Sequence, residues 1–458
     1  MKLTVLGGGG VRSPFLAGAI VHKANDLDIS EIVFMDNDKK KLLIYGGLAR
    51  EIALRINDKI KFTLTVDPVE ALKDADFVIT TLRVGQDYGR VLDEKIALKY
   101  GTLGQETTGA GGFAMAMRSI PVLKSYCNIA LKYAKPGVLI FNFTNPSGLV
   151  TQALRDEGFT NVYGICDNPS EFKKEIADMI NAEHAELSME CFGLNHLSWF
   201  RSIKHNGMEI IHELIDSEDL YEKTEMKYFG KELVKSLGML PNGYLYYYYF
   251  KEEAVNNINK TGKTRGESIL DINSDMTNKL SVLSVEKDFK EVMEVYLKSY
   301  NARENSYMAI ESGTAREKPR KELKDMLLKD RFDGGYAGVA LDFIESYHSG
   351  KESEIVLSFP NSGSIDGLAY DDIVEITCNV RNGAVEPIKI GEVPKAQYNL
   401  IKQVKSYERL SVEAINKKSM DLAMEALMMH PLVNNNNFTY EIVKEYIEAH
   451  RAFIGNWK

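Results

Sequence analysis

Residues 2–10 read Lys2-Leu3-Thr4-Val5-Leu6-Gly7-Gly8-Gly9-Gly10, a short apolar run followed by four consecutive glycines. Ser13-Pro14 and a helical pattern of apolar residues come next, so the expected order is strand, glycine turn and helix. Glycines at such a turn let the backbone approach a pyrophosphate, and the N-terminus of the helix presents N–H groups to it. We therefore predict that Gly7, Gly9 and Gly10 bind a dinucleotide.

A second apolar run, Glu31 to Met35, ends in Asp36. An acid at the end of the second strand accepts hydrogen bonds from both ribose hydroxyls and repels a 2′-phosphate. This spacing favours NAD over NADP. The alternative is that Asp36 only forms a turn, since Asn37-Asp38 follow.

Further apolar runs at 62–66, 77–82, 138–141 and 162–165 alternate with helical segments. This alternation predicts a doubly wound parallel sheet of the Rossmann type, as in lactate and malate dehydrogenases. In such folds ligands bind beyond the carboxyl ends of the strands. Because polar residues follow these runs, we expect them to line one site; they include Thr81, Asn145, Cys166 and Asp167.

The pattern changes after His196. Long helical stretches are expected at 208–239 and 284–305, antiparallel strands at 355–357 and 373–377, and mostly helix from 393 to 458. We predict an NAD-binding Rossmann domain over 1–195. An α+β domain over 196–458 is expected to serve substrate, metal and oligomerisation.

Composition excludes several classes of function. The chain has 458 residues and a net charge of -9, which is the wrong sign for a nucleic-acid footprint. No apolar run approaches the length of a membrane helix. Four widely spaced cysteines do not make a disulfide framework. We expect a cytoplasmic enzyme with neither nucleic-acid nor membrane partners.

Cys166 and His196 are candidate metal ligands, because each follows an apolar run at an expected strand end. Two protein ligands do not complete a structural site, which normally has four, so the expected metal is an open, catalytic one. The alternative is that Cys166 is a small buried hydrophobe and His196 a core histidine.

Two loops are candidates for binding the substrate. Residues 99–112 are rich in glycine and contain one acid, Glu106; the alternative is a flexible surface loop. Residues 261–267 form a small basic loop that, with Arg83 and Arg90, has the geometry to hold a phosphate bidentately. The alternative is that these arginines are solvated.

The chain resembles glycoside hydrolase family four, the NAD- and metal-dependent glycosidases, over essentially its whole length. The residues that carry the resemblance occur in family order: 7–10, 83–85, 99–112, 142–146, 166–169, 193–196, 240–244 and 263–265. The family is an exception to two-carboxylate glycoside hydrolysis.

The resemblance implies an oxidative route. NAD takes hydride from C3 of the sugar, a base removes the C2 proton, and the C1–O bond breaks by elimination. Water then adds at C1 and NADH returns the hydride. By resemblance, Cys166 and His196 bind Mn²⁺ together with sugar oxygens, and Tyr244 is the C2 base. A phenol titrates near pH 10, so Tyr244 needs the charge of the metal. Its neighbours at 246–249 are expected to be packing residues.

The remaining roles are also implied by resemblance. Asp167 corresponds to the leaving-group acid of α-linked members, where many β-linked members have asparagine. Glu106 and Asn145 correspond to contacts with sugar hydroxyls. Arg265 and Arg90 correspond to the clamp for a 6-phosphate.

The substrate we predict is a phosphorylated disaccharide or glucoside, and the activity a 6-phospho-β-glucosidase, because the tracts at 99–101 and 263–267 resemble β members. Asp167 favours a different member of the family, a 6-phospho-α-glucosidase or α-galactosidase. Outside the family, the rival functions are a lactate/malate-type NAD dehydrogenase and a non-catalytic NAD-binding regulator. Relatives imply a homodimer or homotetramer.

Overall fold

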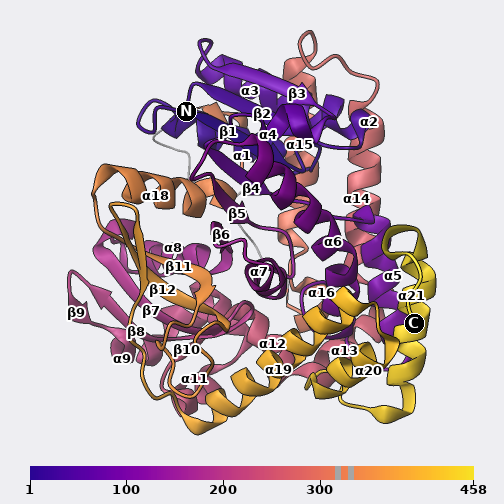
Figure 1. Cartoon of the computed structure of the whole chain (residues 1–458). Helices are drawn as coiled ribbons and strands as arrows, with labels where there is room; N and C mark the ends of the chain where they lie inside the picture. Colours follow the sequence, from indigo (N-terminus) through magenta and orange to yellow (C-terminus); the bar gives the residue numbers. More distant parts are fainter. Residues whose placement is uncertain (315–320, 328–334) are drawn as a thin grey trace.

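The computed structural model describes residues 1–314, 321–327 and 335–458 (Figure 1). One large sheet runs through it in the order β13-β12-β11-β6-β5-β4-β1-β2-β3. Its parallel part comprises β3 (Lys61–Thr65), β2 (Glu31–Met35), β1 (Lys2–Leu6), β4 (Phe77–Thr80), β5 (Leu139–Asn142) and β6 (Val162–Gly164). The order 3-2-1-4-5-6 is that of the doubly wound dinucleotide-binding fold, so the predicted fold class is confirmed.

The sheet continues with three antiparallel strands from late in the chain. These are β11 (Ser353–Pro360), β12 (Ile373–Arg381) and β13 (Ala384–Pro387), and β11 pairs with β6 through Ser358 and Gly164. The predicted antiparallel strands are confirmed. Strands from both sides of residue 195 therefore belong to one sheet. The division of the chain into two domains at that residue stays a prediction.

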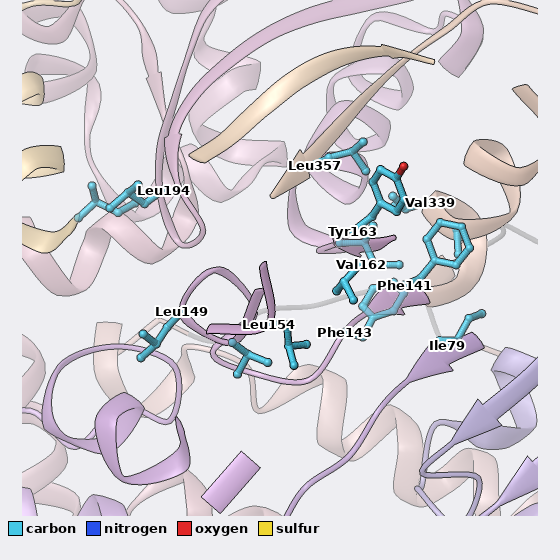
Figure 2. Packing of buried hydrophobic residues seen from close by; sticks show 14 of the residues in the cluster. Ile79, Phe141, Phe143, Leu149, Leu154, Val162, Tyr163, Leu194, Val339 and Leu357 are labelled. Carbon is cyan, nitrogen blue, oxygen red and sulfur yellow. The ribbon is translucent and has the colours of Figure 1, made fainter. Parts of the chain in front are cut away.

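Helices cover the sheet because its central strands β4, β5 and β6 are buried along their whole length. They include α1 (Ser13–Lys23), α3 (Gly47–Ile56), α6 (Gly109–Tyr133), α7 (Ser147–Asp156) and α18 (Gly335–Ser349). Figure 2 shows part of the core, where Ile79, Phe141 and Tyr163 from the parallel strands lie near Val339 and Leu357. Phe343 of α18 packs edge-on against Phe141, with ring centroids 5.1 Å apart. This packing joins residues from the first and the second half of the chain in one core.

A smaller antiparallel sheet contains β7 (Leu187–Leu194), β8 (Leu197–His205), β9 (Met208–Glu209) and β10 (Leu240–Pro241). The β7–β8 turn is only Asn195-His196, and His196 has a positive φ of 65°. The hairpin is tied to the large sheet, since Cys191 N–H donates to Thr377 Oγ1 on β12 at 3.0 Å.

The predicted long helix at 208–239 is wrong. The segment contains β9 and the short helices α9 (Ile211–Asp216), α10 (Glu218–Lys223) and α11 (Lys231–Leu237). Gly230 interrupts it with a φ of 75°, and the Thr224 hydroxyl accepts from Met226 N–H instead of allowing a continuous helix. Side chains of this type compete with helical hydrogen bonds.

The helical stretch expected at 284–305 corresponds to α15 (Phe289–Asn305), which packs on α14 (Arg265–Leu280). The last segment is helical as predicted: α19 (Lys395–Lys417), α20 (Met420–Met429) and α21 (Asn436–Ile454). In α21, His450 bonds to buried Asp93 of α5 (Gln86–Lys99) at 2.6 Å, and Arg118 of α6 donates to both oxygens of the same carboxylate. Within the described residues, no helix is long and apolar enough to cross a membrane.

Candidate active site

A cavity of about 530 Å³ lies beyond the carboxyl ends of the parallel strands. It extends from the first glycine turn to the β7–β8 hairpin. All fourteen residues singled out from the sequence line it: Gly7, Gly9, Gly10, Asp36, Thr81, Arg83, Arg90, Glu106, Asn145, Cys166, Asp167, His196, Tyr244 and Arg265. The expectation that polar strand ends converge is met, while the role of each residue stays a prediction.

The glycine turn joins β1 to α1 and is closely packed. Gly7 has a φ of 101°, which favours glycine, and its N–H donates to Met35 O at 2.9 Å. A Cβ on Gly9 would lie 2.9 Å from a carboxylate oxygen of Asp36. Thr81, after β4, contacts the other side, since its hydroxyl donates to Gly7 O at 3.3 Å. The turn thus leaves no room for side chains where a dinucleotide would approach.

Asp36 is held at the end of β2 by two backbone amides. Gly9 N–H donates to Oδ2 and Asp38 N–H donates to Oδ1, both at 2.9 Å. Burial raises the pKa of this carboxyl, although the two amides oppose the shift. A carboxylate oxygen accepts more than one hydrogen bond, so the fixed group still offers acceptors to ribose hydroxyls. The glycine cradle and this carboxylate together fit NAD.

Cys166, His196 and Tyr244 form a compact group contributed by three elements. Cys166 follows β6, His196 occupies the β7–β8 turn, and Tyr244 lies in the 3-10 turn Gly243–Leu245. Cys166 Sγ is 3.5 Å from His196 Nε2. The rings of His196 and Tyr244 stack with centroids 3.7 Å apart and an angle of 11° between planes.

This group fits a metal with open coordination positions. Burial lowers the pKa of His196 to about 3, so the imidazole is neutral and keeps a lone pair for coordination. Its Nδ1 is buried, and no described residue forms a hydrogen bond with it. Among the described residues there is no cluster of three or more His, Cys, Asp or Glu side chains placed to hold a metal. A divalent ion here would therefore take its other ligands from water or substrate.

Asp167 forms an ion pair that sequence reasoning did not anticipate. Arg12, in the glycine turn, donates to Asp167 Oδ2 at 2.9 Å. Burial raises the pKa of Asp167, and Arg12 works against that shift. The two residues lie 155 positions apart, so no local pattern in the sequence indicates the pair.

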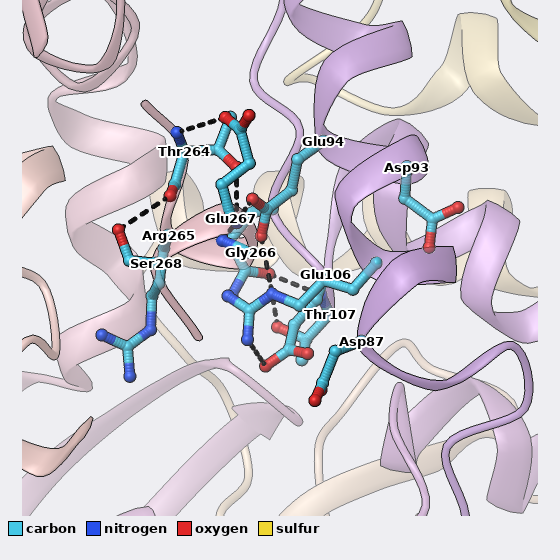
Figure 3. A network of polar contacts seen from close by, with 12 residues as sticks. Asp87, Asp93, Glu94, Glu106, Thr107, Thr264, Arg265, Gly266, Glu267 and Ser268 are labelled. Carbon is cyan, nitrogen blue, oxygen red and sulfur yellow. Dashed lines mark hydrogen bonds and ion pairs between the residues drawn. The ribbon is translucent and has the colours of Figure 1, made fainter. Parts of the chain in front are cut away.

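Glu106 is enclosed by cations rather than exposed on a flexible loop. Arg83 and Arg90 both pair with it, the latter at 3.1 Å, and Arg90 also donates to Glu94 at 2.7 Å. Burial alone raises the pKa of Glu106, but the two arginines outweigh it and hold the pKa well below its usual range. Figure 3 shows Glu94 and Glu106 at the centre of this network, with Arg265 beside it.

Arg265, at the start of α14, contacts a hydroxyl group and an aromatic ring rather than carboxylates. Its Nη1 donates to Ser306 Oγ at 3.2 Å, and the guanidinium lies 5.0 Å from the centre of the Tyr307 ring. Within the described part of the chain, no carboxylate is within ion-pair distance of it. Arg265 is thus a cation on the cavity wall with donors to spare for an anion.

Arg303 of α15 also lines the cavity and was not singled out from the sequence. Its Nη1 donates to Asn273 Oδ1 at 3.2 Å, and its buried Nε has no hydrogen-bond partner in the part of the chain that the structure describes. Burial and the nearby Arg12 lower its pKa. A single arginine within an amphipathic helix carries no local signal of function, so sequence reasoning had no means to find it.

Two family models match the chain, "Family 4 glycosyl hydrolase" over residues 2–182 and "Family 4 glycosyl hydrolase C-terminal domain" over residues 191–433. The chain belongs to glycosyl hydrolase family 4. The predicted family is confirmed.

Among relatives, the chain is 30% identical to a 6-phospho-beta-glucosidase from Thermotoga maritima, over 99% of each sequence. It is 28% identical to a maltose-6′-phosphate glucosidase from Clostridium acetobutylicum, over 99% of this chain and 98% of that one. A solved structure of 6-phospho-beta glucosidase from Thermotoga maritima with manganese, NAD⁺ and glucose-6-phosphate is similar, with a TM-score of 0.81, 29% identity and 99% of both chains covered.

Proposed function

We propose that this protein is a 6-phospho-β-glucosidase that uses NAD and a divalent metal, with Mn²⁺ as the expected ion. The observation that carries the proposal is one cavity that joins the glycine turn and Asp36 to the Cys166–His196–Tyr244 group. Relatives named as 6-phospho-beta-glucosidases support the substrate class.

Tyr244 is the proposed base for the C2 proton of the sugar. Burial raises the pKa of its phenol, and the neighbouring Cys166 raises it further. The phenol is therefore protonated at neutral pH unless a cation lies close to it. When bound, NAD supplies the hydride acceptor, and a divalent cation on Cys166 and His196 supplies positive charge beside Tyr244 and the oxidised sugar.

Other residues of the chain bind and orient the sugar in this proposal. Glu106, with its charge held by Arg83 and Arg90, accepts from sugar hydroxyls, and Asn145 contacts the sugar beside Cys166. Arg265 is the main ligand of the 6-phosphate, because its guanidinium has no carboxylate partner in the described residues. Arg90 is retained as a second phosphate contact, although Glu94 and Glu106 occupy part of its guanidinium.

A 6-phospho-α-glucosidase is the second candidate, and Asp167 is the observation that favours it. Burial raises the pKa of this carboxyl, which is the direction that a leaving-group acid requires, and the pairing with Arg12 opposes it. Its pairing with Arg12 also orients it toward the glycine turn. We retain the β anomer because relatives at 29–30% identity carry that name, while those named for α substrates are 26–28% identical.

The cellular setting and the assembly are part of the same proposal. Four free cysteines suit a reducing, cytoplasmic environment. The family resemblance supports a homodimer or homotetramer.

The decisive experiment is a panel of 4-nitrophenyl α- and β-glucosides and galactosides, each with and without 6-phosphate. It is run with NAD and Mn²⁺ under reducing conditions. We expect hydrolysis of the 6-phospho-β-glucoside without net NADH, and loss of most turnover in Tyr244→Phe. Net NADH accumulation would indicate a dehydrogenase instead. A C2 deuterium label that survives turnover without exchange or isotope effect would exclude the elimination route.

A further inference from the structure

Glu375 is a buried carboxylate on β12 that does not line the cavity. Its residue is 1% exposed, between the fully buried Val374 and Ile376. Asn195 Nδ2 donates to one oxygen at 2.8 Å, and Ser198 Oγ donates to the other at 2.7 Å. The two donors lie on either side of His196, so both oxygens of this carboxylate hold the turn that carries the imidazole.

The same carboxylate is connected to Tyr244. Ser198 Oγ accepts from Asn242 Nδ2 at 3.2 Å, and Asn242 N–H donates to Ser198 O at 3.0 Å. The Asn242 side chain in turn accepts from Tyr244 N–H at 3.0 Å. One branch of this network thus runs from Glu375 through Ser198 and Asn242 to the backbone of Tyr244, and the other ends at Asn195, the residue before His196. His196 and Tyr244 are the residues whose rings stack 3.7 Å apart.

A carboxylate in this position is energetically unfavourable for the fold. Burying an ionised group is unfavourable unless it is paired and hydrogen-bonded, and no cation in the described residues lies within ion-pair distance of Glu375. His196 also has a positive φ, a conformation that non-glycine residues keep only when their surroundings impose it. Glu375 accepts hydrogen bonds from residues on either side of His196 and so holds the turn in this conformation. An apolar residue on β12 would accept neither bond.

We infer that Glu375 is a positioning residue that fixes His196 and Tyr244 relative to Cys166. The inference rests on the proposed function, in which Cys166 and His196 hold the metal. Groups that hydrogen-bond a metal ligand directly typically account for about 10- to 100-fold in metal affinity or activity. We take that range as the upper bound for Glu375, which acts on His196 through Asn195 and Ser198.

The test is Mn²⁺ affinity of the NAD-bound protein, measured from the free-Mn²⁺ EPR signal. Glu375→Ala is expected to weaken Mn²⁺ binding by up to about 100-fold while NAD affinity changes less than about twofold. Glu375→Gln keeps an acceptor for Asn195 and a polar partner for Ser198, and is expected to restore most of the affinity. If Glu375→Ala does not fold, Ser198→Ala replaces it as a smaller change. This variant is expected to give an intermediate loss of Mn²⁺ affinity.

Thr377→Val is the matched control. Thr377 lies two residues along β12, and its hydroxyl donates to Met189 O at 2.8 Å and accepts from Cys191 N–H. This variant removes hairpin contacts from the same strand without touching the turn, so its Mn²⁺ affinity should be unchanged even if its melting temperature falls.

The outcomes separate this inference from the proposed function. If the unaltered protein binds no Mn²⁺, or Cys166→Ser does not weaken binding, the metal site itself is wrong. If that site holds but Glu375→Ala retains full affinity, the inference is overturned. An equal loss in Thr377→Val, or a Glu375→Gln variant as weak as Glu375→Ala, overturns it as well.

Discussion

Replacing Arg265 by Met should selectively remove the preference for a phosphorylated substrate. Among the described residues, only Nη1 of this guanidinium has a hydrogen bond, to Ser306 Oγ, and its face lies over Tyr307. Nη2 and Nε are therefore disposed for a bidentate contact with phosphate oxygens. Two hydrogen bonds to a charged group contribute about 3 to 4 kcal/mol, taking about 1.5 to 2 kcal/mol for each.

That free energy corresponds to a loss of about 10²- to 10³-fold in kcat/KM, since 1.4 kcal/mol is a factor of ten. The assay compares 4-nitrophenyl β-glucoside with its 6-phosphate in the presence of NAD and Mn²⁺. Only the phosphorylated substrate should lose this much, while kcat/KM for the unphosphorylated glucoside should change less than about threefold, because no contact to it is removed.

Arg90→Met is the comparison variant. Arg90 pairs with Glu94 and Glu106, so its removal leaves buried carboxylates without their counterion. Breaking such a pair costs about 3 to 5 kcal/mol of stability, so activity toward both substrates should fall, and the phosphorylated substrate should lose the second phosphate contact in addition. If Arg265→Met lowers both substrates equally, or keeps the phosphate preference, the assignment of Arg265 is refuted.

Groups elsewhere in the site lead to three more predictions. Burial raises the pKa of Glu375 to about 7, above its unfolded value of about 4.5, so its contribution to stability is present below pH 4.5 and lost as pH rises through 7. Glu375→Gln should then raise the free energy of unfolding in urea by up to roughly 3 kcal/mol at pH 8 but little at pH 4.5, and an equal effect at both values would contradict the burial argument. Asp36→Ser should weaken NAD by about tenfold, for a lost charge-assisted hydrogen bond, and admit NADP in calorimetric titration; continued exclusion of NADP would show that Asp36 does not read the ribose. Chelation should abolish hydrolysis and Mn²⁺ should restore it, but not in Cys166→Ser; recovery in that variant would remove Cys166 from the metal site.

The parts of the fold that were predictable are those with local signals. The turn at Gly7–Gly10, the acid after β2 and the polar residues at the strand ends are all visible within short windows of sequence. Whether β11–β13 join the first sheet is set by pairing between Ser358 and Gly164, which no periodicity encodes. The predicted helix at 208–239 failed because Thr224 and Gly230 interrupt an apolar pattern that resembles a helix.

The same distinction between local and long-range signals holds for the candidate site. Cys166 and His196 were recognisable as a pair from their motifs. The contact of Arg12 with Asp167 joins residues 155 positions apart, and that of Asn195 with Glu375 joins residues 180 apart. The two members of each pair are far apart in the sequence. Only the structure therefore shows which partner contacts Asp167 and which contacts Asn195.

The large sheet turns from parallel to antiparallel at the single pair Gly164 and Ser358, two residues before Cys166. A Cβ on Gly164 would lie 2.6 Å from Ser358 Cβ, so the two strands meet there with no space for a side chain. In the proposed function, the groups that bind the dinucleotide therefore come from the first strands, whereas the Cys166–His196–Tyr244 group draws on elements from both halves of the chain. A fragment ending before β11 would retain the glycine turn and Asp36, yet its cysteine would lack the neighbouring strand. The groups that bind the dinucleotide are thus contained in one segment of the chain, whereas the surroundings of Cys166 need strands from two segments.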